Sequence, residues 1–429
     1  MNEHLKKFLG KPNPWRLAVL LLIMAACIVN LAHKRRTESA LIANSSDLSQ
    51  AVWELAAFLP EGDADPAVTP RRFQAVLPDG RSLAVDMNFN NTFSAWPESV
   101  TLTYRPDEPR HTDHRRLKIL PPFDQPAVFS INSDGVAESA PSVDPQGLAA
   151  DLKSFGQRLG GNWPRLEAFT WRNVVPGLDT ADVPLRYGVR MGPRVMHIAR
   201  LNPDLYDFKP YHERDLNIAV ERDALNIAGW SRKLPEAAAL INGGQYYENR
   251  DYIGLLRRDG RYLSDKKHKS WSGYLVSGPR PEAPAEAPRA AVLDLEKEKN
   301  LKPQHFDNVM QSLMLFDDSG KIRVNNSHYL ASRAAVGQDE QGRIWFIMNP
   351  GAVSLHDWAE VLMDPGLGLV RALCLDGGFE AQISRKTPDG QTEAVTAEYL
   401  VFPTETVYAK GMFRSLPSII TAEPRPSGR

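Results

Sequence analysis

Residues 371–384 read RALCLDGGFEAQIS: a short apolar run, an aspartate, two glycines, then an aromatic residue and a glutamate. The apolar run has the length and composition of a core β-strand. A glycine pair allows positive φ and close backbone approach, so successive N–H groups can point into one hollow and hold an anion. The stretch therefore predicts a buried strand that ends in an acidic turn, with Asp376 as its candidate carboxylate.

A second stretch has the same design. The segment AAALINGGQYY is an apolar strand followed by Asn242, Gly243 and Gly244. Either turn alone is weak evidence, because a glycine pair often only reverses the chain direction. Two such turns in one region, each behind an apolar strand, predict a shared site that also includes Gly377 and Gly378.

A third segment, SRAAVG, places Arg333 on a strand of small apolar residues. The planar guanidinium suits phosphate or carboxylate. Two interpretations stay open: a phosphate-binding arginine, or a structural ion pair, for example with Asp376. His328, five residues earlier, is either a loop histidine without a role or a substrate-binding residue. Metal, serine-hydrolase and P-loop signatures are missing from the sequence, so no metal site and no cofactor is predicted.

The order of these and the intervening motifs resembles the phosphodiester glycosidase family over residues 196–420. The motifs are AAALINGGQYY, GLLRRDGRYL, QSLMLFDDSGKI, SRAAVGQDEQGRIWFIM, SLHDWAEVLMDPGLGLVRALCLDGG and FRSLPSII. In the family pattern an N-G-G-aromatic turn, an R-T-A-x-G strand and an L-D-G-G-G-S-S strand end meet around the site. The resemblance implies a sugar-phosphodiester substrate. It marks as site residues Asn242, Gly243, Gly244, Arg333, Gly337, Asp376, Gly377 and Gly378.

Some positions depart from that pattern: Ala334 replaces a threonine, the aromatic Tyr246 comes one position late, and Phe379-Glu380-Ala381 replace Gly-Ser-Ser. Glu380 adds a second carboxylate four residues after Asp376. In an extended chain the two side chains lie about 13 Å apart, too far for the carboxylate pair of a retaining glycosidase. A turn after the glycines would bring them together, raise one pKa and make Glu380 a catalytic acid/base partner of Asp376.

These residues can support chemistry on a sugar-1-phosphodiester. Breaking the sugar C1–O bond expels a phosphate, a good leaving group that needs little proton donation. Asp376 serves as nucleophile or base, Arg333 and the glycine turns hold the phosphate, and Asn242 orients a hydroxyl or the phosphate. We expect a glycosidase that acts on a sugar-1-phosphodiester or a related envelope glycan. The alternative is a non-catalytic glycan-binding or exopolysaccharide-assembly component that keeps the fold.

Residues 17–32 form an apolar segment with basic residues on both sides. The segment is short for the ~20 residues that span a bilayer, but Trp15, Arg16 and Lys34 can extend it at the interfaces. We expect a signal-anchor helix within residues 1–36 that contacts the membrane through residues 15–33, with the C-terminal domain outside the cytoplasm. A cleaved signal peptide, a lipoprotein-type Cys27 and a buried helix of a soluble protein are the alternatives.

The remaining chain is predicted to be α+β, in two parts. Residues 45–165 form a small membrane-proximal region, with a hairpin at 71–87, a strand at 100–105 and a helix that begins at Asp144. Residues 168–422 form a β-rich domain with flanking helices, one beginning at Ser354. A segment rich in Pro, Ala and Glu, 278–300, is predicted to be a mobile surface insertion, and 423–429 a disordered tail.

Composition excludes some partners. The 51 Lys and Arg residues nearly balance the 52 Asp and Glu residues, so no net field attracts nucleic acid. The two cysteines lie far apart in the sequence, and Cys374 is predicted to be a buried packing residue. The expected partners are therefore a glycan or sugar-phosphodiester substrate and a membrane.

Overall fold

The computed structural model describes Leu48, Ala51, Val52, Leu55 and much of residues 71–425. The gaps are 79, 89–96, 106–114, 122–126, 132–136, 141–142, 163–164, 186–187, 190–191, 217–224, 326–328, 398, 402–405 and 409–413. The predicted anchor lies outside the described residues. Among the residues that are described, no helix is long and apolar enough to cross a membrane.

The first body is a six-stranded antiparallel sheet whose strands follow the chain order. They are β1 (Arg71–Val76), β2 (Ser82–Asn88), β3 (Ser99–Arg105), β4 (Arg115–Leu120), β5 (Ala127–Ile131) and β6 (Ala137–Ser139). The predicted hairpin is confirmed: β1 and β2 pair with Val76 opposite Ser82. Gly80 has φ 88 at the turn, a conformation that glycine adopts at little cost.

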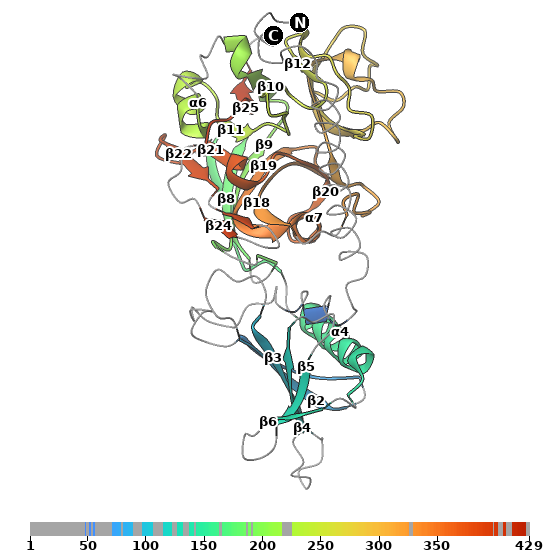
Figure 1. Ribbon diagram of the computed structural model, residues 1–429. Helices are drawn as coiled ribbons and strands as arrows, with labels where there is room; N and C mark the ends of the chain where they lie inside the picture. Colours follow the sequence, from blue (N-terminus) through green and yellow to red (C-terminus); the bar gives the residue numbers. More distant parts are fainter. Residues whose placement is uncertain are drawn as a thin grey trace, which may run out of the picture.

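Helix α4 (Pro145–Asn162) packs beside this sheet (Figure 1). Asp144 caps it, because its carboxylate accepts from the N–H groups of Gln146 and Gly147, both at 3.0 Å. Leu148, Leu152 and Phe155 are buried, as the helical spacing predicts. With residues of β1–β4 and the described residues between 48 and 55, they form a separate hydrophobic core.

The second body contains three antiparallel sheets in the described part of the chain. The nine-stranded sheet has the order β17 (Met314–Phe316), β20 (Leu369–Cys374), β18 (Leu330–Asp339), β19 (Ile344–Ser354), β9 (Val195–Leu201), β8 (Leu178–Pro184) and β7 (Arg172–Val175). Two short strands extend it beside β18: β23 (Tyr399–Val401) and β24 (Thr406–Tyr408).

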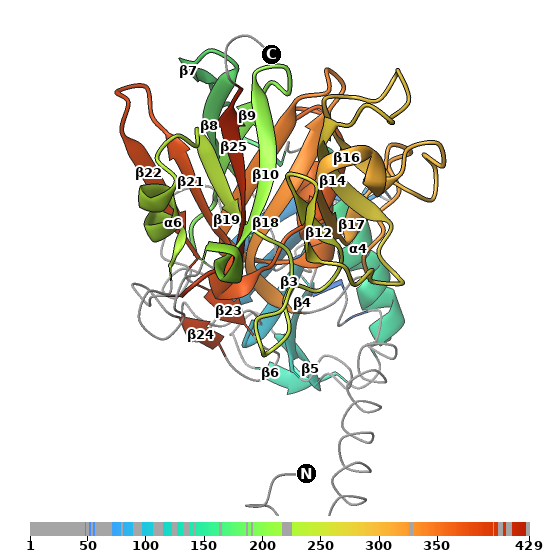
Figure 2. The same ribbon diagram turned by 90° about the horizontal axis from the view of Figure 1, so that it is seen from above.

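The two smaller sheets have five strands each. One has the order β10 (Tyr206–His212), β25 (Ser418–Pro424), β11 (Ala239–Asn242), β21 (Gln382–Lys386) and β22 (Thr392–Thr396), and Figure 2 shows its labelled strands side by side. The other has the order β13 (Arg261–Ser264), β12 (Leu256–Arg258), β16 (Phe306–Ser312), β14 (Gly273–Pro279) and β15 (Ala290–Asp294).

Helices are few in this body. The described ones are α6 (Ile227–Lys233), α7 (Leu355–Leu362) and the 3₁₀ turns η1 (Glu213–Leu216), η2 (Pro303–His305) and η3 (Gly378–Glu380). The predicted helix start at Ser354 is confirmed, because its hydroxyl accepts from the Asp357 N–H at 3.0 Å. The domain is therefore β-rich with few helices.

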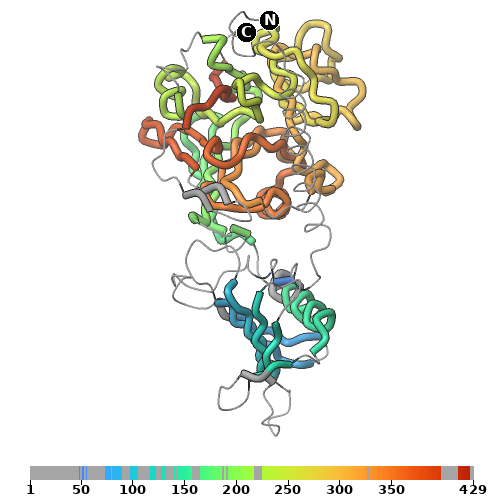
Figure 3. Tube along the Cα trace, in the orientation of Figure 1, coloured from blue at the N-terminus to red at the C-terminus, as the bar shows by residue number. Residues whose placement is uncertain are grey.

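All three sheets contribute to one hydrophobic core, represented by Val336 of β18, Ile241 of β11 and Met310 of β16. Every residue of β19 is buried, so its two faces are both covered. Such a strand reads as a continuous apolar run, without the alternation of a half-exposed strand. The trace in Figure 3 shows this body apart from the first sheet and α4.

Two sequence predictions are wrong. Residues 290–294, placed in a mobile insertion, are the buried strand β15, which pairs with β14. The apolar residues AAVL decide the structure there, although the surrounding composition favours a loop. Residues 423–424, placed in a disordered tail, belong to β25, and Arg425 forms an ion pair with Asp207 at 2.9 Å.

Candidate active site

The two glycine turns lie against each other. The N–H of Asp376 donates to the carbonyl of Gly243 at 3.1 Å, and the N–H of Gly243 donates to the carbonyl of Ser418 at 2.9 Å. On the other side, the N–H of Leu375 donates to Ala334 of β18 at 3.0 Å. Three segments that are distant in sequence, the ends of β11 and β20 and the middle of β18, therefore meet at one place.

Asn242 stabilises this junction, the place where the ends of β11 and β20 meet β18. The residue is 1% exposed, and its side-chain Nδ2 donates to the carbonyls of Asp376 at 2.9 Å and Gly243 at 3.0 Å. Its Oδ1 accepts from the N–H of Gln382 at 3.1 Å. Because these main-chain contacts occupy the amide, Asn242 positions the two turns, whereas the sequence predicted a direct contact with substrate.

The glycines allow the close approach. A Cβ on Gly243 would clash with the Ser418 side chain and lie 3.1 Å from its carbonyl carbon. A Cβ on Gly377 would lie 3.1 Å from the carbonyl oxygen of Ser332 and 3.2 Å from Nη1 of Arg333. Gly244 packs in the same way against the Tyr252 hydroxyl. A side chain at any of these positions would separate the segments that form the site.

The chain turns after Gly377 and brings Glu380 back towards Asp376. Gly378 has φ +69, which favours glycine, and it opens the 3₁₀ turn η3 that ends at Glu380. The sequence left open an extended chain or a turn after the glycines, and the structure has the turn. The identity of residue 378 therefore decides where the second carboxylate lies.

Burial raises the pKa of Asp376 to about 7, and the nearby negative charge of Glu380 acts in the same direction. The Gly377 N–H, which donates to Oδ1 of Asp376 at 3.0 Å, and the charge of Arg333 oppose this rise. An aspartate whose pKa is near neutrality can accept or donate a proton at physiological pH.

Two tyrosines complete the surroundings of the carboxylates, and the sequence analysis did not place either in the site. Tyr246 donates to Oε1 of Glu380 at 3.1 Å, and burial together with the Glu380 charge raises the pKa of Tyr246. Burial and the Asp376 charge raise the pKa of Tyr252. The displaced aromatic after the Asn-Gly-Gly turn was the available signal for Tyr246.

The Nη1 atom of the Arg333 guanidinium lies at this junction. Its Nε donates to Val353 at 3.1 Å and its Nη2 to the Tyr329 carbonyl at 3.0 Å, while Nη1 lies beside Gly377. Burial lowers the pKa of Arg333, and the charge of Asp376 opposes that effect. Among the described residues, no carboxylate forms an ion pair with Arg333, although the Asp376 charge acts on its guanidinium.

One predicted residue is not brought to the junction, and another is not described by the structure. Gly337 lies further along β18, where a Cβ would meet Leu369 at 2.9 Å, so its small size serves strand packing. His328 lies outside the described residues. Cys374 is buried at the end of β20, and burial raises the pKa of its thiol to about 12, as expected of a packing residue.

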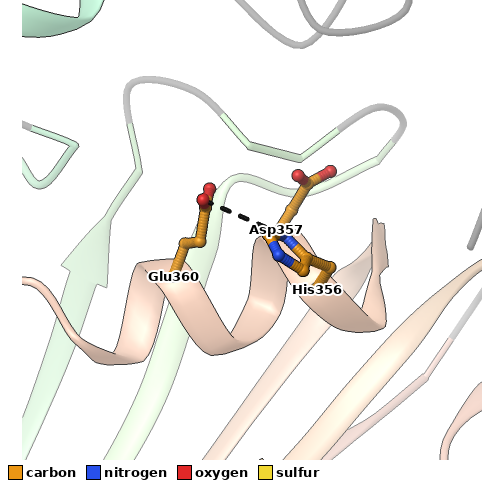
Figure 4. A group of neighbouring side chains, drawn as sticks. All are labelled: His356, Asp357 and Glu360. Carbon is orange, nitrogen blue, oxygen red and sulfur yellow. Dashed lines mark ion pairs between the residues drawn. The ribbon is translucent and has the colours of Figure 1, made fainter. Parts of the chain in front are cut away.

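One group of side chains has a composition that suits a metal ion. His356, Asp357 and Glu360 project from the same part of α7, with ligand atoms within 4.8 Å of one another (Figure 4). Glu360 already pairs with Arg165 at 2.8 Å and with His356 at 3.9 Å. Because these ion pairs already engage two of the three side chains, we assign no metal to the group.

Comparisons with known proteins give a match to one family model. Residues 235–402 match the model described as phosphodiester glycosidase, a range that contains every candidate residue named above. No curated protein matches the chain. Two solved structures are similar: the catalytic domain of zebrafish N-acetylglucosamine-1-phosphodiester alpha-N-acetylglucosaminidase, auto-inhibited by its pro-peptide, and a protein from Synechocystis. The first has 16% identity and a TM-score of 0.38, and covers 62% of this chain and 85% of its own. The second has 14% identity and a TM-score of 0.37, and covers 83% and 80%.

Proposed function

We propose, from the premise that residues 235–402 form a phosphodiester glycosidase family domain, that the chain hydrolyses a sugar-1-phosphodiester or a related envelope glycan. One observation carries the proposal. Burial and the nearby Glu380 charge both raise the pKa of Asp376, and the Arg333 guanidinium lies beside Gly377, the residue that follows Asp376. A carboxylate pair with an adjacent guanidinium suits the cleavage of a glycosyl phosphate.

In this mechanism Asp376 acts as a general base. Water attacks C1 of the sugar, and its proton passes to the ionised Asp376 carboxylate. The C1–O bond breaks, and its electron pair leaves with the phosphate oxygen. The products are the free sugar and a phosphate monoester. The leaving phosphate needs no proton, so the base that activates water is the group whose pKa matters most.

Arg333 and Glu380 have different roles. The Nη1 side of Arg333 stabilises the charge that develops on the departing phosphate. Glu380 accepts a hydrogen bond from Tyr246, and its negative charge adds to the effect of burial in raising the pKa of Asp376. In this scheme Arg333 and Asp376 contact the reacting atoms, whereas Glu380 acts through Asp376.

The remaining sequence suggests a location for this activity. Residues 17–32 are apolar between basic flanks, the pattern of a signal anchor. We propose that they attach the protein to a membrane and that the catalytic domain lies outside the cytoplasm, on the side where envelope glycans are assembled. Residues 45–165 would then be an accessory region between the membrane and the catalytic domain.

Release of free sugar from a synthetic N-acetylglucosamine-1-phosphate diester tests the proposal. The full chain should turn the diester over, and Asp376→Asn should lose activity by at least about a hundredfold because the base is gone. Asp204→Asn makes the same chemical change at an exposed position and should keep full activity. No turnover by the wild type, or equal turnover by the wild type and Asp376→Asn, refutes the mechanism.

A second function has one observation in its favour. Phe379 is 6% exposed and lies 4.9 Å from the Arg414 guanidinium, where the family pattern has a small residue. A filled position favours a non-catalytic glycan-binding component. The same assay separates the two functions, because that component binds the sugar without releasing it.

A further inference from the structure

A cavity of about 350 Å³ lies between the turn after β11 and the β12–β13 hairpin. Its lining residues fall within three segments, 212–215, 247–252 and 261–266. Neither candidate carboxylate, nor Arg333, belongs to this lining. The volume is within the range of about 300–1,000 Å³ for small-molecule sites. The cavity is therefore distinct from the carboxylate junction and large enough to hold a ligand.

Two exposed aromatic rings line this cavity. Tyr247 and Tyr262 are each 50% exposed, and they are two of the six exposed large hydrophobic side chains in the described residues. The guanidinium of Arg257 lies 5.2 Å from the Tyr262 ring centroid, which supports that ring from one side. Rigid tyrosines offer an apolar face at low entropic cost and a hydroxyl at its edge. They therefore suit a ligand with one apolar face and several polar groups.

The charges of the lining cancel. Three basic side chains, Arg214, Arg261 and Lys266, face three acidic ones, Asp215, Asp251 and Asp265. Arg214 pairs with Asp251, and Arg261 pairs with Asp215. Burial holds the pKa of His212 below its usual range, so the imidazole is neutral at neutral pH. With no net charge, the cavity does not select an anion or a cation, but it offers many hydrogen-bonding groups.

The turn that carries Tyr247 is held in place. Arg250, within this turn, makes a two-point contact with Glu213, at 2.7 Å for each bond, and its carbonyl accepts from His212 at 3.0 Å. The N–H of Arg250 donates to the Tyr247 carbonyl at 2.7 Å. A fixed turn is preorganised for binding, because little conformational freedom is lost when a ligand arrives.

The cavity adjoins the candidate active site through Tyr252. This tyrosine lines the cavity, and its hydroxyl lies against Gly244 of the first glycine turn. We propose that the cavity binds a neutral pyranose ring of a glycan, with Tyr247 and Tyr262 on its C–H face and the ion-paired groups on its hydroxyls. That this ring is part of the substrate rests on the proposed function.

Ligand-observed NMR on the full chain, in a detergent without a sugar headgroup, tests the cavity. The probes are methyl glycosides of glucose, galactose, mannose and N-acetylglucosamine, with methyl glucuronide as the charged comparison. We expect a neutral glycoside to bind both the wild type and Asp376→Asn. Tyr247→Ala and Tyr262→Ala should each weaken binding by about tenfold, whereas Tyr262→Phe should retain it.

Leu205→Ala is the matched control, because it removes an exposed apolar side chain that does not line the cavity. Absence of binding by every neutral glycoside, binding of the glucuronide alone, or binding that neither tyrosine variant weakens overturns the inference. Tyrosine-dependent binding without diester turnover keeps the cavity and rejects the proposed reaction. Diester turnover without glycoside binding keeps the proposed reaction and rejects the cavity as a glycan-binding site.

Discussion

At the scale of single residues, the junction holds an aspartate in surroundings that disfavour its charge. Asp376 is partly buried beside a second carboxylate, and the opposing Gly377 N–H and Arg333 do not restore its usual pKa. Such an arrangement is costly for stability and useful for proton transfer. Two predictions follow from this pKa, one for the rate of reaction and one for stability.

The first prediction concerns the pH dependence of diester hydrolysis. If ionised Asp376 is the base, kcat/KM rises with pH through about 7 and then levels off. Glu380→Gln removes the neighbouring negative charge, so the inflection should move to lower pH by about one unit. Glu340→Gln, at an exposed turn, should leave the profile unchanged. A profile that falls through pH 7 would assign Asp376 the role of an acid instead.

The second prediction concerns stability and does not depend on activity. The folded-state pKa of Asp376 is raised above its ordinary 3.8, so its stabilising effect is complete below pH 3.8 and is lost as the pH rises through 7. Asp376→Asn removes the charge and should stabilise the protein at pH 8, by on the order of 2 kcal/mol, with little effect at pH 4. Denaturant unfolding at the two pH values measures this, and equal effects at both would contradict the raised pKa.

The candidate residues were predictable from the sequence to different degrees. Asn242 and Asp376 were found because each ends an apolar strand at a glycine pair, which is a local pattern. The role of Asn242 in positioning the two turns was not predicted, because its hydrogen-bond partner Gln382 is distant in sequence. Tyr246 was missed for the same reason: its contact with Glu380 depends on how β11 and η3 meet.

At the scale of secondary structure elements, the junction depends on how closely β11, β20 and β25 approach each other. A side chain at Gly243 would meet Ser418 at the start of β25. We predict that Gly243→Ala destabilises the second body by about 2–3 kcal/mol, within the range for overpacked cores. Denaturant unfolding measures the change.

A second substitution tests the cause of that effect. Ser418→Gly in the Gly243→Ala background removes the clashing side chain but leaves the backbone carbon at 3.1 Å, so it should restore part of the lost stability. Gly156→Ala is the contrasting change. It lies inside α4, where the new Cβ meets only ordinary contacts with Leu55 at 3.6 Å, so it should stabilise that helix by about 0.5–1 kcal/mol. A neutral Gly243→Ala would mean that β25 moves aside freely.

Elements with local signals were predicted well. The β1–β2 hairpin, α4 and α7 are defined by turn residues or caps that lie inside the element itself. The strand β15 was missed because its neighbours in sequence are Pro, Ala and Glu, while its stability comes from pairing with β14 and burial against the sheet. Pairing between strands is a tertiary interaction that a local pattern does not record.

At the scale of the whole molecule, the described residues form two bodies with separate hydrophobic cores. The core of the first body uses only residues between Leu48 and Phe155, whereas the principal core of the second body begins at Leu178. A core that is complete within one segment allows that segment to unfold as a cooperative unit.

The last prediction is that calorimetry of the full chain shows two separable unfolding transitions. Leu102 lies in the core of the first body, and Leu102→Ala should lower the Tm of one transition only. Ile347 of β19 is fully buried in the second body, and Ile347→Ala should lower the Tm of the other transition only. Each change should cost about 2–5 kcal/mol, because it leaves a cavity in a close-packed core. A single transition that both variants shift equally would show that the bodies unfold together. Two transitions would instead mean that damage to the accessory region leaves the carboxylate junction folded, since no residue of that junction belongs to the first core.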